Sequence, residues 1–273
     1  MNILDTILEY KAEQEMPAKR KAVPLSEMRR RASDAPEPRD FAGALSGADG
    51  CVALIAEVKR ASPSAGDLVK GDFKPVEIAH TYARAGAHAI SVLTDERFFK
   101  GRLDYLTAIR RAVALPVLRK DFIVDEYQLH EARWAGADAV LLIVAALDDA
   151  MLADFHQCAQ SLGLAVLVEV HDEAEVGRAL HAGARIVGVN NRDLRDFKVD
   201  LHTTARCAYA TREAHSRGQV LALVSESGIA SPEHVAQVAG MGAQAILVGE
   251  SLITSQNMAA DVTRFSRVPR PIS

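Results

Sequence analysis

The hydrophobic pattern of the chain repeats one short phrase four times, at residues 85–93, 135–142, 182–189 and 241–248. Each copy contains Gly-Ala, one polar residue and then a run of mostly apolar side chains rich in Val and Ile. A glycine after an amphipathic segment commonly ends a helix in the left-handed conformation, and a long apolar run is typical of a strand buried on both faces. The phrase therefore predicts a helix-to-strand junction at Gly86, Gly136, Gly183 and Gly242.

Further apolar runs lie between these copies, at residues 52–58, 116–119, 164–170 and 220–225, which brings the expected strands to eight. Successive strands begin about 22 to 37 residues apart, the length of one strand and a returning helix. Residues 75–85 and 125–135, in these gaps, carry apolar side chains at helical spacing. Eight similarly apolar parallel strands close without edges, so we predict a (β/α)8 barrel, a TIM barrel of the α/β class. An open, doubly wound sheet is the alternative.

Residues 1–45 stand outside the repeat, and we expect them to form an N-terminal helical extension that caps a barrel of residues 46–273. Ile3, Ile7 and Tyr10 are spaced as on one face of a helix. The rest of the extension reads as a loop because of its prolines, Pro17, Pro24, Pro36 and Pro38. Its basic triplets resemble a nucleic-acid arm, but eight acidic residues balance eight basic ones. A solvated, mixed-charge extension is therefore the better interpretation.

Composition excludes several classes of protein. Of the 273 residues, 49% are apolar and 25% are charged, as in an average globular protein, so disordered, collagen-like and coiled-coil classes are excluded. The formal net charge is −4, so no overall electrostatic field attracts nucleic acid or an anionic membrane. The longest purely apolar run, residues 139–147, is far shorter than the roughly 20 residues that cross a bilayer. The first residues lack the basic-then-apolar layout of a signal peptide. We expect a cytoplasmic protein, a monomer or weak homo-oligomer, with neither nucleic acid nor membrane as a partner.

Common cofactor and metal motifs do not fit the chain. Residues 240–245 match the loose dinucleotide fingerprint, but they precede a strand instead of linking a strand to the helix that follows it. Cys51, Cys158 and Cys207 lie too far apart in the sequence for a Cys-x-x-Cys site. The nine histidines are scattered, and we interpret each as structural or solvated. We therefore expect no cofactor and no metal.

Polar side chains gather where the expected strands end. The C-terminal ends of parallel barrel strands surround one mouth, and polar residues within apolar runs are costly unless they are used. Because side chains alternate along a strand, Glu57 and Lys59 share one face, and Lys120 and Glu169 can point into the same mouth. The later strands end in further polar or glycine residues: Asn190, Arg192, Glu226, Ser227, Gly228, Gly249, Glu250 and Ser251. We predict a functional site of ammonium and carboxylate groups around one cavity.

The turns after the last two strands predict a phosphate site. Residues 227–229 and 249–251 are short, glycine-containing segments between a strand and a helix. At such positions backbone N–H groups and the helix dipole attract an anion, and these loops often bind phosphate in (β/α)8 barrels. The first strand neighbours the eighth in a closed barrel, so Ser62 and Ser64 can add hydroxyl groups from the first loop.

Together these residues resemble the indole-3-glycerol phosphate synthase family of tryptophan biosynthesis, over nearly the whole chain. The most specific elements are the Glu-x-Lys-x-x-Ser-Pro-Ser of residues 57–64 and the Lys-Asp-Phe of residues 120–122. Other similar segments are residues 91–95, 99–101, 169–173, 188–194 and 225–229. The resemblance implies a carboxy-lyase that converts 1-(2-carboxyphenylamino)-1-deoxyribulose 5-phosphate into indole-3-glycerol phosphate, with loss of carbon dioxide and water and without cofactor or metal.

The resemblance also implies roles for individual residues. Lys120 matches the family's acid in ring closure, and Glu169 its candidate base. Lys59 matches the lysine that holds the substrate carboxylate, with Glu57 orienting it. The implied binding residues are Asn190, Arg192 and Glu226 for hydroxyls and carboxylate, Ser62, Ser227, Gly228 and Gly249 for the phosphate, and Phe99 and Phe122 for the aromatic ring. Glu250 would repel phosphate, so we expect its side chain to turn outward and only its backbone N–H to contribute, beside Ser251.

Other functions fit the residues when these are read alone. A lysine at the end of a barrel strand forms a Schiff base in class I aldolases, in which case Lys120 would be a nucleophile. A barrel with the same phosphate loops can also be a non-catalytic sugar-phosphate-binding subunit. Phosphoribosylanthranilate isomerase shares the phosphate loops but has no need of two lysines.

Overall fold

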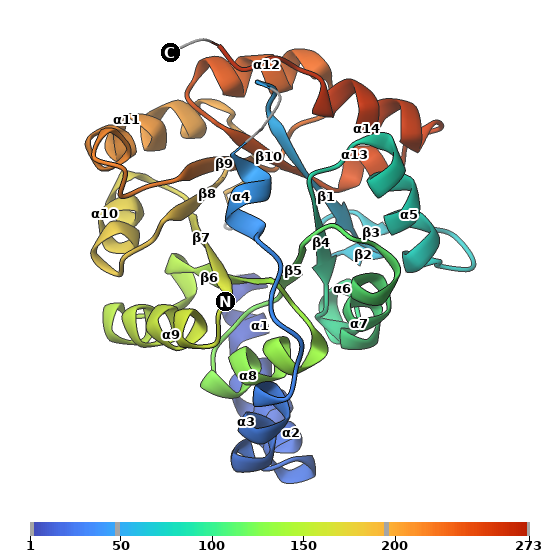
Figure 1. The fold of residues 1–273 in the computed structure, drawn as a ribbon, viewed down its shortest axis with the longest axis vertical. Coiled ribbons are helices and arrows are strands. Elements are labelled where there is room, and N and C mark those ends of the chain that lie inside the picture. The colour runs from blue at the N-terminus through green and yellow to red at the C-terminus, as the bar shows by residue number, and fades with distance from the viewer. Residues whose placement is uncertain (1–2, 47–49, 194–196, 272–273) are drawn as a thin grey trace.

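The computed structural model describes residues 3–46, 50–193 and 197–271, so Leu194 of the family-like segment 188–194 lies outside the described residues. Its parallel strands form one closed barrel (Figure 1). They are β1 (Ala53–Val58), β4 (Ala89–Leu93), β5 (Val117–Lys120), β6 (Ala139–Ile143), β7 (Ala165–Val170), β8 (Ile186–Asn190), β9 (Ala222–Glu226) and β10 (Ala245–Val248). β1 pairs with both β4 and β10, which closes the sheet. The predicted (β/α)8 barrel is confirmed, and the open sheet is excluded.

Helices surround the strands in an outer ring. They are α5 (Pro75–Ala85), α7 (Leu103–Ala112), α8 (Glu126–Ala135), α9 (Asp149–Ser161), α10 (Glu173–His181), α11 (His202–Ser216), α12 (Pro232–Gly240) and α14 (Met258–Ser266). Shorter elements lie in the loops: the hairpin β2 (Ala61–Ser62) and β3 (Gly66–Asp67), α6 (Glu96–Phe99), the 3-10 helix η2 (Val144–Ala146) and α13 (Glu250–Ile253). The repeated glycines, Gly86, Gly136, Gly183 and Gly242, all have positive φ, between 90° and 108°, as their position after a helix predicts.

Side-chain alternation divides the strands into two faces. Ile55, Leu118, Leu167 and Leu247 fill the inside of the barrel, whereas residues such as Leu54 pack outward against the helices. The side chains two positions beyond the inner set therefore also point inward, at the C-terminal ends of the strands. This alternation directs the predicted polar residues into the mouth.

The N-terminal extension contains more helix than predicted. It comprises α1 (Ile3–Tyr10), the π-helix η1 (Lys11–Glu15), α2 (Met16–Ala22), α3 (Leu25–Ser33) and α4 (Phe41–Leu45). The expected loop is wrong at Pro17, which lies in α2, where that helix continues directly from η1. Pro24 lies between α2 and α3 and is the N-cap of α3. Proline is tolerated at the start of a helix because its missing N–H has no intrahelical acceptor there. Pro36 and Pro38 lie in the loop between α3 and α4, as expected.

The extension runs from one end of the barrel to the other. Ile3, Leu4 and Ile7 of α1 lie at the mouth, where they line the cavity described below. α3 packs along α8, and Phe41 and Leu45 of α4 pack against inward-facing residues at the opposite end of the barrel. Figure 1 shows α4 in front of the barrel and α1 behind it. The same segment therefore contributes to both ends of the barrel.

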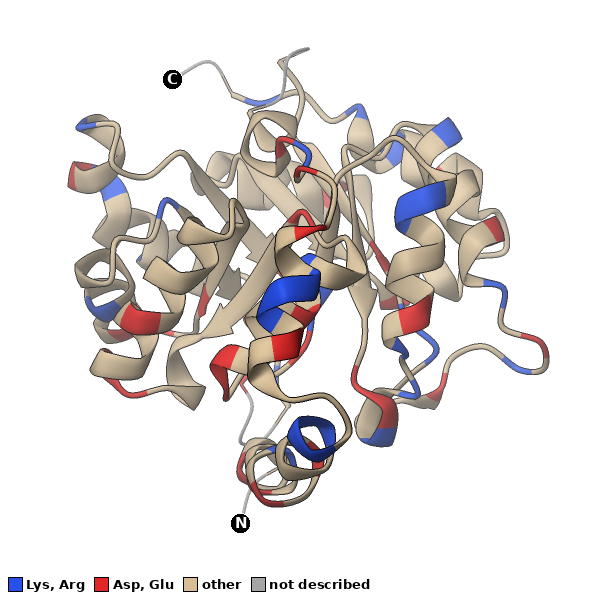
Figure 2. Ribbon diagram, turned by 60° about the horizontal axis from the view of Figure 1, so that its bottom comes forward, with Lys and Arg blue, Asp and Glu red and all other residues tan. Residues whose placement is uncertain are grey.

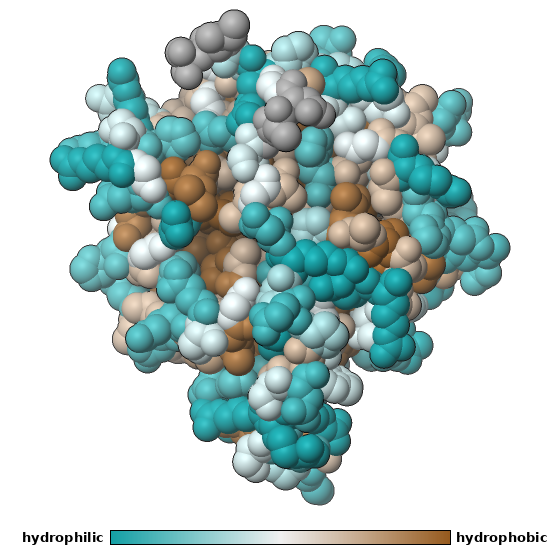
Figure 3. Space-filling model, in the orientation of Figure 1, coloured by the Kyte–Doolittle hydropathy of each residue, from teal (hydrophilic) through white to brown (hydrophobic). Residues whose placement is uncertain are grey.

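The surface carries charges of both signs, and acidic and basic residues alternate over the outer helices (Figure 2). On the face of Figure 3, apolar surface is confined to areas between helices and is separated by hydrophilic side chains. Among the described residues, none of the helices has the length and apolarity needed to cross a bilayer.

Candidate active site

A cavity of about 380 Å³ opens at the C-terminal ends of the strands. It brings together every site residue predicted from the sequence: Glu57, Lys59, Ser62, Phe99, Lys120, Phe122, Glu169, Asn190, Arg192, Glu226, Ser227, Gly228, Gly249, Glu250 and Ser251. Their elements are spread around the whole barrel, and the closed sheet makes them converge.

Lys120, the last residue of β5, lies among carboxylates from other strands. Its Nζ is 3.4 Å from Glu169 Oε2 of β7 and 3.5 Å from Glu226 Oε2 of β9. Burial alone would lower the pKa of this ammonium, but Glu169, Glu226 and Glu57 raise it far above its ordinary value. Lys120 is therefore a cation that can donate a proton or a hydrogen bond into the cavity.

The second lysine forms a separate pair. Lys59 Nζ is 2.8 Å from Glu57 Oε2, and both side chains extend from the end of β1. Burial opposes ionisation of Glu57, yet Lys59 and Lys120 hold its pKa below the usual range. Gly249 makes this arrangement possible, since a Cβ atom there would stand 2.1 Å from Glu57 Oε2.

Glu226 differs from the other carboxylates. Apart from the Lys120 ammonium, its buried oxygens have no hydrogen-bond partner among the described residues. Burial, together with the nearby Glu169 and Glu57, raises the pKa of Glu226 to about 8 in spite of Lys120. These neighbours therefore shift Glu226 toward its protonated form, in which it can donate a hydrogen bond. Its carboxyl group approaches Gly188, where a Cβ would lie 2.1 Å from Oε1.

Glu169 is held in its ionised form. Asn190 Nδ2 donates to Glu169 Oε1 at 3.2 Å, and Lys120 faces Oε2. Burial would raise the pKa of Glu169, but Lys120, His171 and the Asn190 hydrogen bond lower it. The mouth therefore contains one carboxyl group with a lowered pKa, Glu169, and one with a raised pKa, Glu226, next to one ammonium, a combination suited to acid–base chemistry.

The two glycine-containing turns lie side by side at the mouth. Ser227 and Gly228 both have positive φ, 67° and 77°, and Ser251 Oγ donates to Ile229 O at 2.9 Å, which joins the turn after β9 to α13. The Glu250 side chain is 48% exposed, with its carboxylate 4.0 Å from Arg192 Nη2. The Glu250 side chain thus turns toward solvent.

Apolar side chains form another wall of the cavity. The rings of Phe99 and Phe122 are 5.9 Å apart at an angle of 34°. Phe99 ends the short helix α6, whose N-cap Asp95 accepts hydrogen bonds from the backbone of Phe98 and Phe99. This tilted pair can contact a flat aromatic group.

Sequence reasoning missed the charged residues that support this mouth. Lys11 of η1 is fully buried, with its Nζ 2.7 Å from Asp121 Oδ1 and 3.1 Å from Asp95 Oδ2. His171, which we interpreted as structural or solvated, has Nε2 3.5 Å from Glu169 Oε1. The position of His171 two residues after Glu169 was an available signal. Nothing in the local pattern around Lys11 indicates that an ammonium there is buried.

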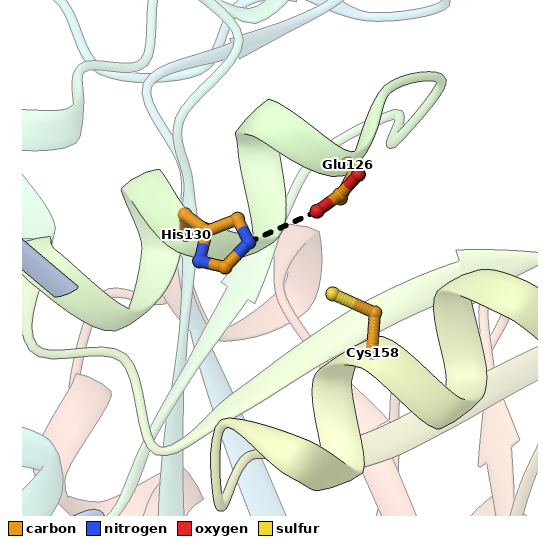
Figure 4. A group of neighbouring side chains, drawn as sticks. All are labelled: Glu126, His130 and Cys158. Carbon is orange, nitrogen blue, oxygen red and sulfur yellow. Dashed lines mark hydrogen bonds and ion pairs between the residues drawn. The ribbon is translucent and has the colours of Figure 1, made fainter. Parts of the chain in front are cut away.

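Three side chains that could bind a metal ion lie away from the mouth, between α8 and α9 (Figure 4). Ligand atoms of Glu126, His130 and Cys158 lie within 4.8 Å of one another. Glu126 Oε1 is already 2.6 Å from Arg29 Nη2 and 3.2 Å from His130 Nε2. Burial and the Glu126 charge raise the pKa of the Cys158 thiol. Because the Glu126 carboxylate is already paired with Arg29 and the pKa of Cys158 is raised, these side chains form an interhelical contact and not a cation site.

Comparison with known proteins gives the family. The model of the family described as "Indole-3-glycerol phosphate synthase" matches residues 4–265. The chain belongs to the indole-3-glycerol phosphate synthase family. The curated indole-3-glycerol phosphate synthase of Roseiflexus sp. (strain RS-1) is 53% identical over 266 residues, which cover 95% of this chain and 96% of the relative. That of Chloroherpeton thalassium is 50% identical, with 95% and 98% covered.

Solved structures with low sequence identity share the fold. A thiamine phosphate pyrophosphorylase from Pyrococcus furiosus has a TM-score of 0.60 and 15% identity, with 80% of this chain and 95% of that chain covered. A 3-hexulose-6-phosphate synthase has a TM-score of 0.58 and 18% identity, with 80% and 99% covered. At such identities the likeness concerns the barrel and not the reaction.

Proposed function

We propose that this member of the indole-3-glycerol phosphate synthase family closes the indole ring of 1-(2-carboxyphenylamino)-1-deoxyribulose 5-phosphate through acid catalysis by Lys120. The product is indole-3-glycerol phosphate, and carbon dioxide and water are lost. The observation that carries the proposal is the ammonium of Lys120 among the carboxylates of Glu57, Glu169 and Glu226, inside the cavity.

Ring closure needs a proton at the substrate ketone. As the aromatic carbon attacks the carbonyl carbon, negative charge develops on the carbonyl oxygen, and an ammonium in a partly desolvated site stabilises that charge and donates the proton. A Schiff-base aldolase would require a neutral amine. The carboxylates that raise the pKa of Lys120 therefore favour the ammonium form over the neutral amine that a Schiff base requires.

The substrate carboxylate is assigned to Lys59. Glu57, 2.8 Å away, keeps this ammonium in place, and Arg192 adds a second positive charge on the same cavity. Once the new C–C bond has formed, the carboxylate leaves as carbon dioxide and its bonding electrons restore the aromatic ring. Holding the carboxylate in one orientation aligns the bond that breaks.

Dehydration completes the reaction. The leaving hydroxyl must be protonated, by Lys59 or Lys120, while Glu169 removes a proton from the substrate. Glu169 suits the base because its neighbours keep it ionised. Asn190 holds the Glu169 carboxylate, and the protonated Glu226 donates a hydrogen bond to a substrate hydroxyl.

Binding of the two ends of the substrate follows from the walls of the cavity. The phosphate is assigned to the turns after β9 and β10, with Ser227, Gly228 and Gly249, and to Ser62 of the first loop. The backbone N–H of Glu250, beside Ser251, completes this assignment. The aromatic ring is assigned to Phe99 and Phe122, on the apolar wall.

The proposal also assigns a role to each of the two segments of the chain. Residues 46–273 form the catalytic barrel, and residues 1–45 cap it. The position of Ile3, Leu4 and Ile7 in the cavity wall supports this role, since apolar side chains over the mouth exclude water from the ammonium and carboxylate groups.

The test is incubation of the purified chain with the carboxyphenylamino deoxyribulose phosphate. We expect indole fluorescence to appear together with carbon dioxide. Lys120→Ala should lower kcat by several orders of magnitude and leave substrate affinity within roughly tenfold, because the ammonium acts mainly in the transition state. Lys74→Ala is the matched control, since Lys74 is exposed and pairs only with Glu77 among the contacts described.

Two outcomes would contradict the proposal. Tight binding of the substrate without indole formation would indicate a non-catalytic binding barrel. A covalent adduct on Lys120, trapped by borohydride in the presence of substrate, would indicate Schiff-base chemistry.

A further inference from the structure

A histidine with no role in the steps above contacts the base Glu169. His171 follows Glu169 by two residues, in the loop between β7 and α10, and its Nε2 is 3.5 Å from Glu169 Oε1. This Nε2 atom is buried and makes no hydrogen bond among the described residues, so its contact with Glu169 is an ion-pair contact. A buried imidazole nitrogen that faces a carboxylate is costly unless the two atoms interact.

Glu175 holds the imidazole in this orientation. Its Oε2 accepts the backbone N–H of His171 at 2.8 Å and lies 3.1 Å from His171 Nδ1. The backbone N–H of Glu175 in turn donates to Asp172, the N-cap of α10, at 2.9 Å. Since a carboxylate can only accept, Nδ1 carries a hydrogen, and the other ring nitrogen is directed at Glu169.

The charges around His171 favour its protonated form. The acidic groups that face it are Glu169 of β7, Glu175 of α10 and Glu226 of β9. Although burial opposes the charge, these carboxylates raise the pKa of His171 above its ordinary value. As an imidazolium, His171 donates from Nδ1 to Glu175 and places its positive charge 3.5 Å from Glu169 Oε1.

We propose that His171, held by Glu175, is a positioning residue that fixes Glu169 and keeps it available as a base. This inference rests on the proposed function, because it deepens the role assigned there to Glu169. Asn190 donates a hydrogen bond to Oε1, and the His171 ring nitrogen lies at ion-pair distance from the same atom. Oε2 is thereby left beside Lys120, in the cavity.

Loss of the imidazolium has two consequences for Glu169. Its carboxylate keeps only Asn190 on Oε1 and is free to rotate. It also loses a nearby positive charge, so its affinity for a proton increases and more of the base is protonated as the pH falls. The positive charge of Lys120 remains in place. The loss of activity should therefore be greater at mildly acidic than at alkaline pH.

The experiment compares His171→Gln and Glu175→Gln with the parent chain in the indole assay between pH 5.5 and 8.5. We expect His171→Gln to lower kcat by about 10- to 100-fold, the range typical of residues that orient a functional ligand, with KM nearly unchanged and with a larger loss at the acidic end. Glu175→Gln should act in the same direction but less strongly. His181→Gln, at the exposed end of α10, is the matched control and should behave as the parent.

A second measurement does not depend on activity. Histidine signals followed by NMR should show His171 titrating above the ordinary value of about 6.5, and Glu169→Gln should lower that value because a facing charge is removed. Titration of His171 that is unaffected by Glu169→Gln would overturn the inference, as would a His171→Gln variant with the parent's kcat and pH profile, or with a loss confined to KM. An inactive parent chain would instead overturn the proposed function, and the titration would still decide the role of His171.

Discussion

Replacing Lys11 with Met would test how the N-terminal extension is attached to the mouth of the barrel. The Lys11 side chain is fully buried, and its ammonium is 2.7 Å from Asp121 and 3.1 Å from Asp95. The side chains of both aspartates are at most 1% exposed. Met fills a similar volume without charge, so the substitution leaves two buried carboxylates short of a counter-charge.

The expected loss of stability follows from these contacts. Removing one partner of a buried ion pair typically costs about 3–5 kcal/mol. Asp121 keeps Thr94 at 2.6 Å and Arg119 at 3.0 Å, so we expect the lower end, about 3 kcal/mol. At about 2–4 °C per kcal/mol for a chain of this size, Tm should fall by about 6–12 °C.

Arg20→Met is the control for this prediction, followed by circular dichroism during heating at neutral pH. Arg20 also joins the extension to the barrel, 2.6 Å from Asp125, but its side chain is 44% exposed. Exposed pairs contribute roughly 0–1 kcal/mol, so its Tm should change little. Equal Tm values for the two variants would refute the reasoning that burial makes the Lys11 contacts important.

Further substitutions test other parts of the site. Ser227→Glu places a negative charge at the proposed phosphate turn, so KM should rise by about 100-fold or more (~3 kcal/mol) with kcat little changed. An unaltered KM in steady-state kinetics would contradict the assignment of the phosphate to this turn. Gly188→Ala sets a Cβ 2.1 Å from Glu226 Oε1 and should lower kcat by about tenfold or more, whereas Gly177→Ala, with open space around it, should not. Glu226 binds its proton more tightly when folded, with a pKa of about 8, than in the unfolded chain, where the pKa is about 4.3. Its contribution to stability is therefore complete below the lower value and is lost as the pH rises through the higher one. Glu226→Gln should gain stability relative to the parent across that range in urea unfolding, and parallel pH dependences would contradict this.

Local pattern was sufficient to predict most of the fold. The glycine of each repeat ends a helix through its own backbone conformation, and the apolar run after it reflects burial on both faces. The extension was harder to predict because proline occurs both in loops and at the start of helices. Pro24 stands at the start of α3, whereas Pro17 lies within the helical stretch that runs from α1 through η1 into α2.

The position of the site was predictable for a similar reason. Alternation along each strand places Glu57, Lys120, Glu169 and Glu226 on the inner face near its end, and closure of the barrel brings these ends together. Lys11 and His171 were not predicted, because each acquires its importance from a contact with another element. Lys11 meets Asp121 across more than 100 positions of the chain.

By itself, the sequence determined which segments become strands and helices and which side chains face the mouth, since both depend on neighbours along the chain. Only the tertiary structure decided which of the buried carboxyl groups has a raised pKa and which a lowered one. The pKa of a buried carboxyl group depends on burial and on the distance to charges from other strands. Glu169 and Glu226 both end as inward-facing glutamates beside Lys120, yet their pKa values shift in opposite directions because their remaining neighbours differ.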